Sequence, residues 1–383
     1  MQRIENYGSF LQAYSLKQML EELGYEVCFV DYEIEPCIVH PMSAPVPKRS
    51  IPYRVVRKLF HLAKGMVETL AGERTRREKL ESMCLRVNYP RYLKELGVTD
   101  ERMENIPVDV LVIGSDEVFN CLQTNPAVGY SKQLFGENVS AKRVITYAAS
   151  AGFTTVSGLK EAGIQEKVAR MLQNNFTCFS VRDGNTYELI HQLTGIIPQE
   201  HLDPVLVADF SKQIVEKNDM QQYVVVYSYE NRMQDLLDEA EAIQTFAHNH
   251  GLKTVSIGNF QSWTDIKLEA SPFELLGYIK NADYVVTDTF HGTIFSIILK
   301  KQFATLIRSS NQQKLRDLLS RFGLQNRQII CLEDMEAILT TPVCFEQYET
   351  IRITERKRSL EYLASAVSGT TEISSTCKCC GED

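Results

Sequence analysis

Hydrophobic positions along the first half of the chain follow a helical pattern and then fall into short runs. Leucine and methionine at helical spacing between positions 11 and 23 precede Gly24, so residues 9–23 are predicted to form a helix that ends at this glycine. Apolar runs predict strands at 27–32, 108–113, 143–149 and 178–181, with a helix over 159–174. Strands that alternate with helices favour a parallel sheet with helical crossovers.

The same alternation starts again in the second half. Strands are predicted at 223–229, 252–258, 283–288 and 303–307, and helices at 232–250, 272–280 and 291–299. A last helix, within 345–367, is long enough to cross back onto the first half. We therefore expect an α/β protein whose domains are 1–205, with a basic helical insertion at about 45–105, and 206–344, followed by the crossing helix and a polar tail, 368–383.

The first predicted helix lacks a strand in front of it. A helix that opens with NYGSF is normally fed by a strand, but only five residues precede Asn6, and Gln2 and Arg3 are polar or charged. We expect either that Met1 is an internal methionine of a longer chain, or that the backbone groups of the neighbouring strand pair with another partner.

Composition excludes several classes of protein. Apolar residues make up 44% and charged residues 23% of the 383 residues, and no apolar run approaches the roughly 20 residues of a membrane span. Disordered, collagen-like and integral membrane proteins are thereby excluded. The first residues do not resemble a secretory signal, so the cytoplasm is the expected compartment. A net charge of −8 argues against nucleic acid as a partner.

Basic residues are concentrated in one segment. Residues 48–79 carry ten Lys or Arg against three Glu, and apolar side chains are interspersed among them. Such a segment can lie on the anionic inner face of a membrane, which would make the protein peripheral there. The competing interpretation is a solvated helical arm packed on its own domain.

Candidate chemistry lies in the polar loops that follow the predicted strands, where ligands bind in open parallel sheets. TDTFHG places His291 in the first turn of a helix, a setting for a general acid that contacts phosphate, although Thr287, Asp288 or Thr289 could simply cap that helix. Arg182, in SVRD, suits a carboxylate or phosphate, or else pairs with Asp183 or Glu188. Asp116 is a candidate base, or else a helix cap, and Lys314 and Arg316 are candidate anion contacts, or else solvated residues. The remaining candidates are substrate-binding positions in the loops: Asn6, Gly8, Ser115, Asp288 and Gly292.

Several common motifs are absent. The sequence has no G-x-G-x-x-G after a strand, no Walker A lysine pattern and no G-x-S-x-G, which removes the main support for NAD-dependent, P-loop and esterase functions. No metal site is predicted in the body of the chain. In the tail, Cys377, Cys379 and Cys380 supply an incomplete ligand set for a metal or an iron–sulfur cluster.

Several motifs in collinear order resemble the polysaccharide pyruvyl transferase family. They are NYGSFLQAYSLKQMLEELGYEVCFVDY, DVLVIGSDEVFN, SVRD, DP at 203–204, ADYVVTDTFHGTIFSIILKKQF and KLRDLLSRFGLQNR. Glu117 and Phe119 stand where the family usually has Gln and Trp. The tail CKCCGED is similar to a junction with the cysteine-rich, ferredoxin-like module that some members carry.

This resemblance implies two Rossmann-like domains that face each other across a cleft, as in the glycosyltransferase B type. It implies transfer of pyruvate from phosphoenolpyruvate onto two hydroxyls of a sugar as a ketal, without cofactor or metal. The partners would be phosphoenolpyruvate and a glycan acceptor of the cell envelope, such as an exopolysaccharide precursor, either free or lipid-linked. His291 would be the acid and Arg182 the substrate clamp. Two alternatives stay open: a nucleotide-sugar glycosyltransferase of similar fold, and a non-catalytic protein of glycan assembly.

Overall fold

The computed structural model shows a mixed α/β protein with parallel sheets. It describes residues 2–39, 88–217, 219–229, 232, 233, 237–308 and 311–370. The predicted insertion is described only from residue 88, where 88–96 are helical, and the basic segment 48–79 lies outside the described residues. In the described part of the chain, no helix is both long and apolar enough to cross a membrane.

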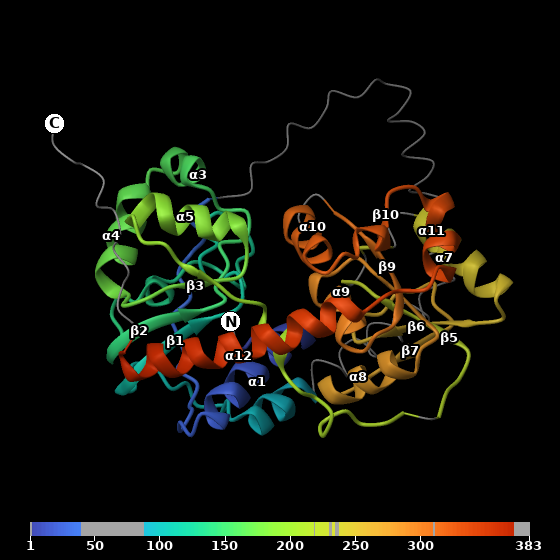
Figure 1. The fold of residues 1–383 in the computed structure, drawn as a ribbon, viewed down its shortest axis with the longest axis horizontal. Coiled ribbons are helices and arrows are strands. Elements are labelled where there is room, and N and C mark those ends of the chain that lie inside the picture. Colours follow the sequence, from blue (N-terminus) through green and yellow to red (C-terminus); the bar gives the residue numbers. More distant parts are fainter. Residues whose placement is uncertain are drawn as a thin grey trace, which may run out of the picture.

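The first group of elements is built on four short parallel strands. β1 pairs with β2, β3 joins β2 through isolated bridges, and β3 pairs with β4. α4 and α5 pack against each other beside these strands (Figure 1). The bounds are α1 Tyr7–Glu22, β1 Val108–Gly114, β2 Ala141–Tyr147, α3 Val156–Glu161, α4 Gln165–Asn175, β3 Ser180–Val181, α5 Gly184–Thr194, β4 Gln199–Glu200 and α6 Pro204–Val207.

The second group holds a six-stranded parallel sheet in the order β10-β9-β8-β5-β6-β7. Its middle strand β5, YVVVY, is buried at every position because apolar cores cover both faces of the sheet, one holding the side chains at 223, 225 and 227 and the other those at 224 and 226. The bounds are β5 Tyr223–Tyr227, α7 Leu237–Asn249, β6 Lys253–Ile257, β7 Ile266–Leu268, α8 Pro272–Asn281, β8 Tyr284–Thr287, α9 Phe290–Ile298, β9 Gln302–Leu306, α10 Gln312–Arg321, β10 Gln328–Ile329 and α11 Met335–Thr340.

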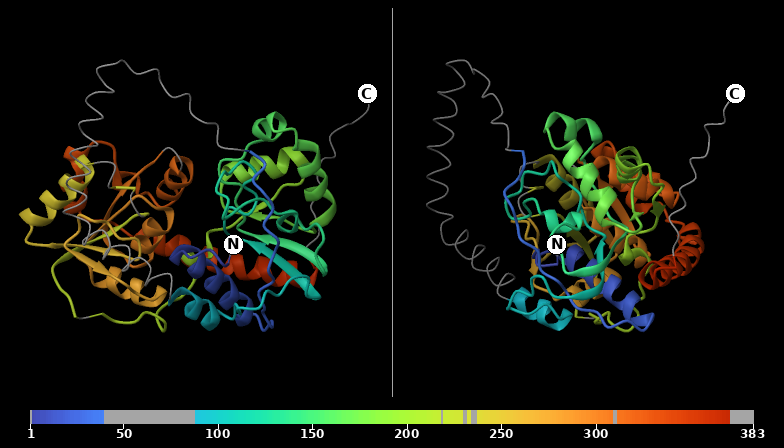
Figure 2. Two further views of the ribbon diagram at one scale, coloured as in Figure 1. Left: turned by 180° about the vertical axis from the view of Figure 1, so that it is seen from behind. Right: turned by 90° about the vertical axis from the view of Figure 1, so that its left-hand side faces the viewer.

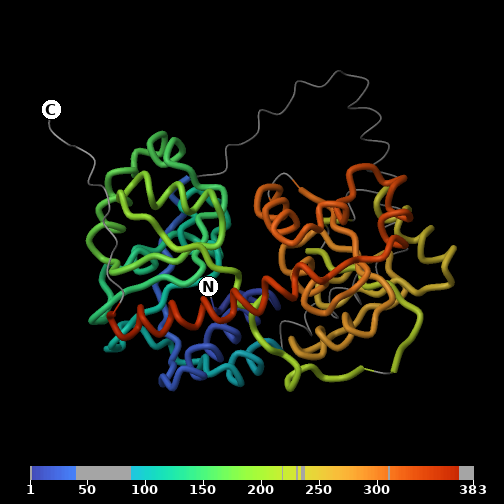
Figure 3. The backbone as a smooth tube through the Cα atoms, in the orientation of Figure 1, coloured from blue at the N-terminus to red at the C-terminus, as the bar shows by residue number. Residues whose placement is uncertain are grey.

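A single long helix links the two groups. α12, Glu346–Ser368, runs from the second group back along the first, as Figure 2 shows from behind and the tube in Figure 3 shows along its length. Near its end, Tyr362 donates a hydrogen bond to the carbonyl of Thr146 in β2 (2.8 Å), and Arg143 donates to the carbonyl of Val367. The predicted crossing of this helix is therefore confirmed.

The largest hydrophobic core is shared by both groups. It runs from α1 and α6 into the second sheet and reaches Leu363 of α12. Apolar contact on this scale holds α1 against α8 and α6 against α9. The loops at the start of α1 and of α9 are thus fixed relative to each other.

Two predicted elements differ from the structure, and three observed strands lack a prediction. No strand forms over 27–32, where only Asp31 makes a bridge, to Glu104, because the segment has no neighbouring strand to extend its pairing. The predicted helix 159–174 is two helices, interrupted at Gly163, whose φ of 70° ends the first one. The short strands β4, β7 and β10 were not predicted, since two or three residues give too little alternation to recognise.

Candidate active site

Two cations meet over one aromatic ring at the start of α9. The guanidinium of Arg182, just after β3, lies 4.8 Å from the centre of the Phe290 ring, and the ammonium of Lys314, from α10, lies 5.5 Å from the same ring. The faces of aromatic rings attract cations, most strongly where water is excluded. Phe290, which is 9% exposed, therefore brings together two positive charges that are far apart in the sequence.

Arg182 is held in place by a buried ion pair. Its Nη1 donates to the backbone carbonyl of Ser115 and to Oδ2 of Asp203 at 2.9 Å, and the two charged side chains are 4% and 1% exposed. Burial alone would lower the pKa of Arg182, but Asp203 and the neighbouring carboxylates outweigh it and raise the pKa. Its Nε is buried and has no hydrogen-bond partner among the described residues, so one donor remains for a ligand.

The predicted alternative partners of Arg182 are engaged elsewhere. Asp183 caps α5, since its Oδ1 accepts from the backbone N–H of Thr186 at 2.8 Å, and its Oδ2 accepts from the Ser150 hydroxyl at 2.6 Å. Glu188 contacts Gln192 on its own helix. The pairing of Arg182 with Asp183 or Glu188 is therefore wrong, and Asp203 takes that place.

His291 lies in the first turn of α9 and packs against the start of α1. A Cβ atom added to Gly8 would lie 2.2 Å from the imidazole Nδ1, so only glycine leaves room for this ring. The other ring nitrogen, Nε2, lies 3.8 Å from Oδ2 of Asp203 and has no hydrogen-bond partner in the described chain. Gly8 thus sets the position of His291.

The imidazole of His291 is neutral near pH 7 in this structure. Burial lowers its pKa to about 4, Asp203 opposes the shift, and the charges of Arg182 and Lys314 add to it. The carboxylate of Asp203 lies beside this imidazole, but its charge does not outweigh burial. A further anion between the two cations and the ring would favour the protonated form.

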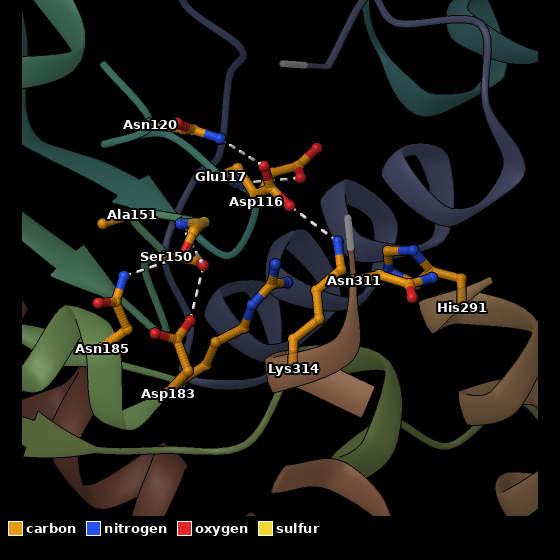
Figure 4. A network of polar contacts seen from close by, with 12 residues as sticks. Asp116, Glu117, Asn120, Ser150, Ala151, Asp183, Asn185, His291, Asn311 and Lys314 are labelled. Carbon is orange, nitrogen blue, oxygen red and sulfur yellow. Dashed lines mark hydrogen bonds and ion pairs between the residues drawn. The ribbon is translucent and has the colours of Figure 1, made fainter. Parts of the chain in front are cut away.

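The loop after β1 supplies two carboxylates (Figure 4). Lys314 Nζ donates to Oε1 of Glu117 at 2.7 Å, and Oε2 of Glu117 accepts from Asn120 at 2.8 Å. Burial would raise the pKa of Glu117, but the charge and hydrogen bond of Lys314 outweigh it and lower the pKa. Asp116 accepts from the Ser9 hydroxyl at 3.1 Å and from the N–H of Glu117. No helix follows Asp116 directly, so its predicted role as a helix cap is wrong.

Two of the predicted substrate-binding positions take part in helix caps. Asn6 is the N-cap of α1, and its Oδ1 accepts from the N–H of Gly8 at 2.7 Å. Gly292 donates its N–H to the hydroxyl of Thr289, the N-cap of α9, at 2.9 Å. The predicted capping by Thr289 is therefore confirmed, and it leaves the imidazole of His291 without a part in the cap.

Ser115 acts through its backbone. Its carbonyl accepts from Arg182 and also from Gln12 of α1, whose amide donates to Asp203 as well. Ser115 has a φ of 68°, a left-handed conformation that is uncommon outside glycine, and its hydroxyl is buried without a partner among the described residues. The strained turn directs its carbonyl toward Arg182.

The remaining two predicted residues lie apart from the cation pair. Asp288 is fully buried, and its Oδ2 lies 3.1 Å from Nε of Arg308 and 3.8 Å from that of Arg232. Burial raises its pKa, and the two arginines offset this only in part. Asp288 thus fixes the loops after β8 and β9. Arg316 is exposed on α10, and none of the described ion pairs or hydrogen bonds joins it to the cluster.

Among the described residues, no group of three or more His, Cys, Asp or Glu side chains is arranged to hold a metal ion. The cysteines at 377, 379 and 380 lie outside the described residues.

One protein family matches most of the chain. The family model named polysaccharide pyruvyl transferase matches residues 6–310, which include all the candidate residues described above except Lys314 and Arg316. The chain belongs to the polysaccharide pyruvyl transferase family. No curated protein matches the chain.

Solved structures that match are distant. The glycosyltransferase of kitacinnamycin is 12% identical, with a TM-score of 0.44, over 94% of this chain and 95% of that one. An O-GlcNAc transferase mutant from Thermobaculum terrenum is 14% identical, with a TM-score of 0.36, over 73% of this chain and 56% of that one. The α,α-trehalose 6-phosphate synthase from Burkholderia multivorans is 10% identical, with a TM-score of 0.36, over 77% and 74%.

In this pyruvyl transferase family member, sequence reasoning missed three residues of the cluster. Asp203 begins an Asp-Pro pair, which predicts a helix cap, and its Oδ1 does accept from the N–H of Val205 in α6. Its other oxygen meets Arg182, which no local pattern could reveal. Phe290 precedes the predicted His291, and Glu117 follows the predicted Asp116. Including the sequence neighbours of each candidate residue would have added both to the predicted site.

Proposed function

We propose that this protein transfers pyruvate from phosphoenolpyruvate onto two hydroxyls of a sugar in a surface polysaccharide or its precursor, with release of phosphate. Family membership supports transfer to a polysaccharide. The observation that carries the donor assignment is the meeting of Arg182 and Lys314 over Phe290, beside His291. Phosphoenolpyruvate has a carboxylate and a phosphate, and two fixed cations match two anionic groups.

Arg182 would bind one anionic group through its free Nε while Asp203 keeps the guanidinium oriented. Lys314 would bind the other group once it leaves Glu117. Arg182 is almost fully buried, so its charge interactions are stronger than in water, whereas Lys314 is about one quarter exposed. Neither contact requires a metal ion.

His291 would donate a proton to the methylene carbon of the donor, which becomes a methyl group. The adjacent carbon then becomes an oxocarbenium-like centre, a sugar hydroxyl adds to it, phosphate leaves, and the second hydroxyl closes the ketal. Because His291 is neutral without a ligand, it would take up its proton when the anionic donor binds and raises its pKa.

Asp116 would accept the proton of the attacking hydroxyl. Its Oδ2 is bound by the Ser9 hydroxyl, and Ser9 follows Gly8, which contacts His291. The two proposed catalytic side chains are thereby linked through the first turn of α1. Phosphate, as the leaving group, carries away the other hydroxyl proton.

The position of Asp288 weakens the alternative function, that of a nucleotide-sugar glycosyltransferase. That function needs a carboxylate free to bind a ribose, and Asp288, in the loop after β8, is a carboxylate in a suitable position of the sequence. In the structure it is fully buried and paired with Arg308 and Arg232. A membrane contact through 48–79 and a peripheral cytoplasmic location stay predictions, because this segment lies outside the described residues.

A donor and acceptor screen tests the proposal. The protein is incubated with phosphoenolpyruvate and a panel of free and lipid-linked glycans, and phosphate release is measured. A parallel series replaces phosphoenolpyruvate with nucleotide sugars. Acceptor-dependent phosphate release supports the proposal, whereas consumption of a nucleotide sugar alone would replace it with the glycosyltransferase function.

A further inference from the structure

One aromatic ring beside the candidate active site is not used by the proposed donor site. Tyr229 follows β5 by two residues and is 41% exposed. Because Tyr227 of β5 pairs with Thr287 of β8, Tyr229 leaves the sheet at the same edge as the loop that leads to His291. A large aromatic side chain that is exposed at the ligand-binding edge of a parallel sheet is available to a ligand.

The hydroxyl of Tyr229 lies near the proposed base. Burial raises the pKa of Tyr229, the carboxylate of Asp116 raises it further, and the side-chain amide of Asn6 lowers it by hydrogen bonding. Asn6 caps α1 and stands two residues before Gly8, which contacts His291. Tyr229 therefore lies at the side of the site where an attacking sugar hydroxyl must reach Asp116.

The backbone of Tyr229 is fixed by hydrogen bonds. Its carbonyl accepts from Nε2 of Gln261 at 3.1 Å and from the N–H of Arg232 at 3.2 Å. Gln261, in the loop after β6, is fully buried, so it anchors the turn from 229 to 232 to the interior. An aromatic ring on an anchored turn loses little conformational freedom when it binds a ligand.

Arg232 lies over this ring, and its charge is weakly engaged by the protein. Its guanidinium carbon is 4.6 Å from the ring centre of Tyr229, where the ring face attracts the cation. Its side chain is 31% exposed, and its one ion pair within the described ranges is with Asp288, at 3.8 Å from Nε to Oδ2. That distance is too long for a hydrogen bond. Arg308 binds the same oxygen of Asp288 more closely, at 3.1 Å.

The donor groups of Arg232 are therefore available. No hydrogen bond of its side chain is found within the part of the chain that the structure describes. An anionic group can bind Arg232 without breaking a hydrogen bond of the protein, whereas the same group would have to displace Glu117 from Lys314. The two anionic groups of phosphoenolpyruvate are already matched by Arg182 and Lys314. A further cation, on the ring beside Asp116, indicates a charge on the acceptor.

We propose that Tyr229 and Arg232 bind the acceptor, and that the acceptor sugar carries an anionic group, either a carboxylate or a phosphate. The proposal rests on the proposed function, because it needs Asp116 as the base that the sugar hydroxyl reaches. The apolar face of the sugar packs on the ring of Tyr229, and the planar guanidinium binds the anionic group through two parallel hydrogen bonds.

Binding of simple sugars tests the proposal without turnover. Methyl glucuronide and glucose 1-phosphate are titrated into the full chain, with methyl glucoside as the neutral reference, and affinity is measured by ligand-observed NMR. We expect at least one acidic sugar to bind about tenfold more tightly than the neutral one, in line with a charged hydrogen bond. Arg232→Gln should remove this preference, and Arg170→Gln, exposed on α4, should keep it. The better of the two acidic sugars identifies the anionic group.

Two substitutions of Tyr229 test the ring. Tyr229→Ala should weaken the binding of acidic and neutral sugars alike, by about fivefold, whereas Tyr229→Phe keeps the ring and should bind like the unchanged protein. Melting temperatures establish that each variant folds. Phosphoenolpyruvate should bind equally to Arg232→Gln and to the unchanged protein.

The outcomes separate this proposal from the reaction. Equal affinity for acidic and neutral sugars, no binding of either acidic sugar, or a preference that persists in Arg232→Gln would overturn the proposal. Weaker binding of phosphoenolpyruvate to Arg232→Gln would overturn it by assigning this arginine to the donor, and tight binding of uridine diphosphate that Tyr229→Ala abolishes would do so by assigning the ring to a nucleobase. Sugar binding as expected, without acceptor-dependent phosphate release, would reject the proposed function and keep the sugar site. Phosphate release with no effect of either variant on sugar binding would do the reverse.

Discussion

The ammonium of Lys314 lies 2.7 Å from a carboxylate oxygen of Glu117, and this ion pair joins α10 to the loop after β1. Both side chains are about one quarter exposed, so the pair is only partly shielded from water. It connects the two groups of elements at the place where the cations meet over Phe290. An anionic ligand that binds Lys314 must therefore compete with a carboxylate of the protein itself.

Glu117→Gln should strengthen the binding of anions. The neutral amide no longer competes for Lys314, and the loss of a partly exposed ion pair corresponds to about 1 kcal/mol, or about fivefold in affinity. Calorimetric titration with inorganic phosphate and with phosphoenolpyruvate checks this, and Glu161→Gln, at an exposed position, is the control. Unchanged affinity would show that the pair does not limit access to Lys314.

His291→Ala should lower turnover by at least the roughly 100-fold typical of losing a general acid. The imidazole also fills the space beside Gly8, so the melting temperature must be measured together with kcat. His248→Ala, on the exposed side of α7, is the matched control. A folded variant with unchanged kcat would remove His291 from the mechanism.

Arg182→Lys should raise the KM for phosphoenolpyruvate by about 10-fold to 100-fold. A lysine cannot bind Asp203 and a ligand with the geometry of a planar guanidinium, and a hydrogen bond to a charged group contributes about 1.5–3 kcal/mol. Steady-state kinetics separates KM from kcat, and Arg316→Lys, exposed on α10, serves as reference. If KM stays the same, Arg182 only supports the fold.

His201 should make the stability of the protein depend on pH. Its side chain is fully buried, and burial together with Arg358 and Arg321 lowers its pKa to about 3. Below pH 6.5 the unfolded chain binds a proton that the folded chain excludes, so the free energy of unfolding should fall as the pH falls, by up to about 1.4 kcal/mol per pH unit for this group. Denaturant unfolding between pH 7 and pH 4 measures the slope, which His201→Gln should reduce. An equal slope in both proteins contradicts this assignment.

Much of the fold follows from local sequence. Buried strands such as 223–227 and capped helices such as α9 are set by neighbouring residues, so they were predicted within a few residues. The failure at 27–32 has a different cause. That segment has the alternation of a strand, but a strand also requires a paired neighbour, which local pattern does not supply.

The site was only partly predictable for the same reason. Because polar loops follow parallel strands at one end of a sheet, the approach of Asp116 to Arg182 could be expected, whereas His291 comes from the other sheet. The charged residues that pair with the loop residues could not be predicted, because Asp203 and Lys314 come from distant parts of the chain. Asp288 is the opposite case. It lies in a polar loop after a strand, as expected for a ligand-binding residue, but its side chain is buried in the interior.

The most direct test of the central claim is product analysis with carbon-labelled phosphoenolpyruvate in heavy water, in the presence of EDTA. We expect the label to move to the glycan as an acid-labile ketal, with one phosphate released per group transferred. The transferred methyl group should carry one deuterium, since its third hydrogen comes from the solvent through His291. Phosphate release without transfer of label, no transfer to any acceptor, or transfer that stops in EDTA and returns with a divalent ion would contradict this mechanism.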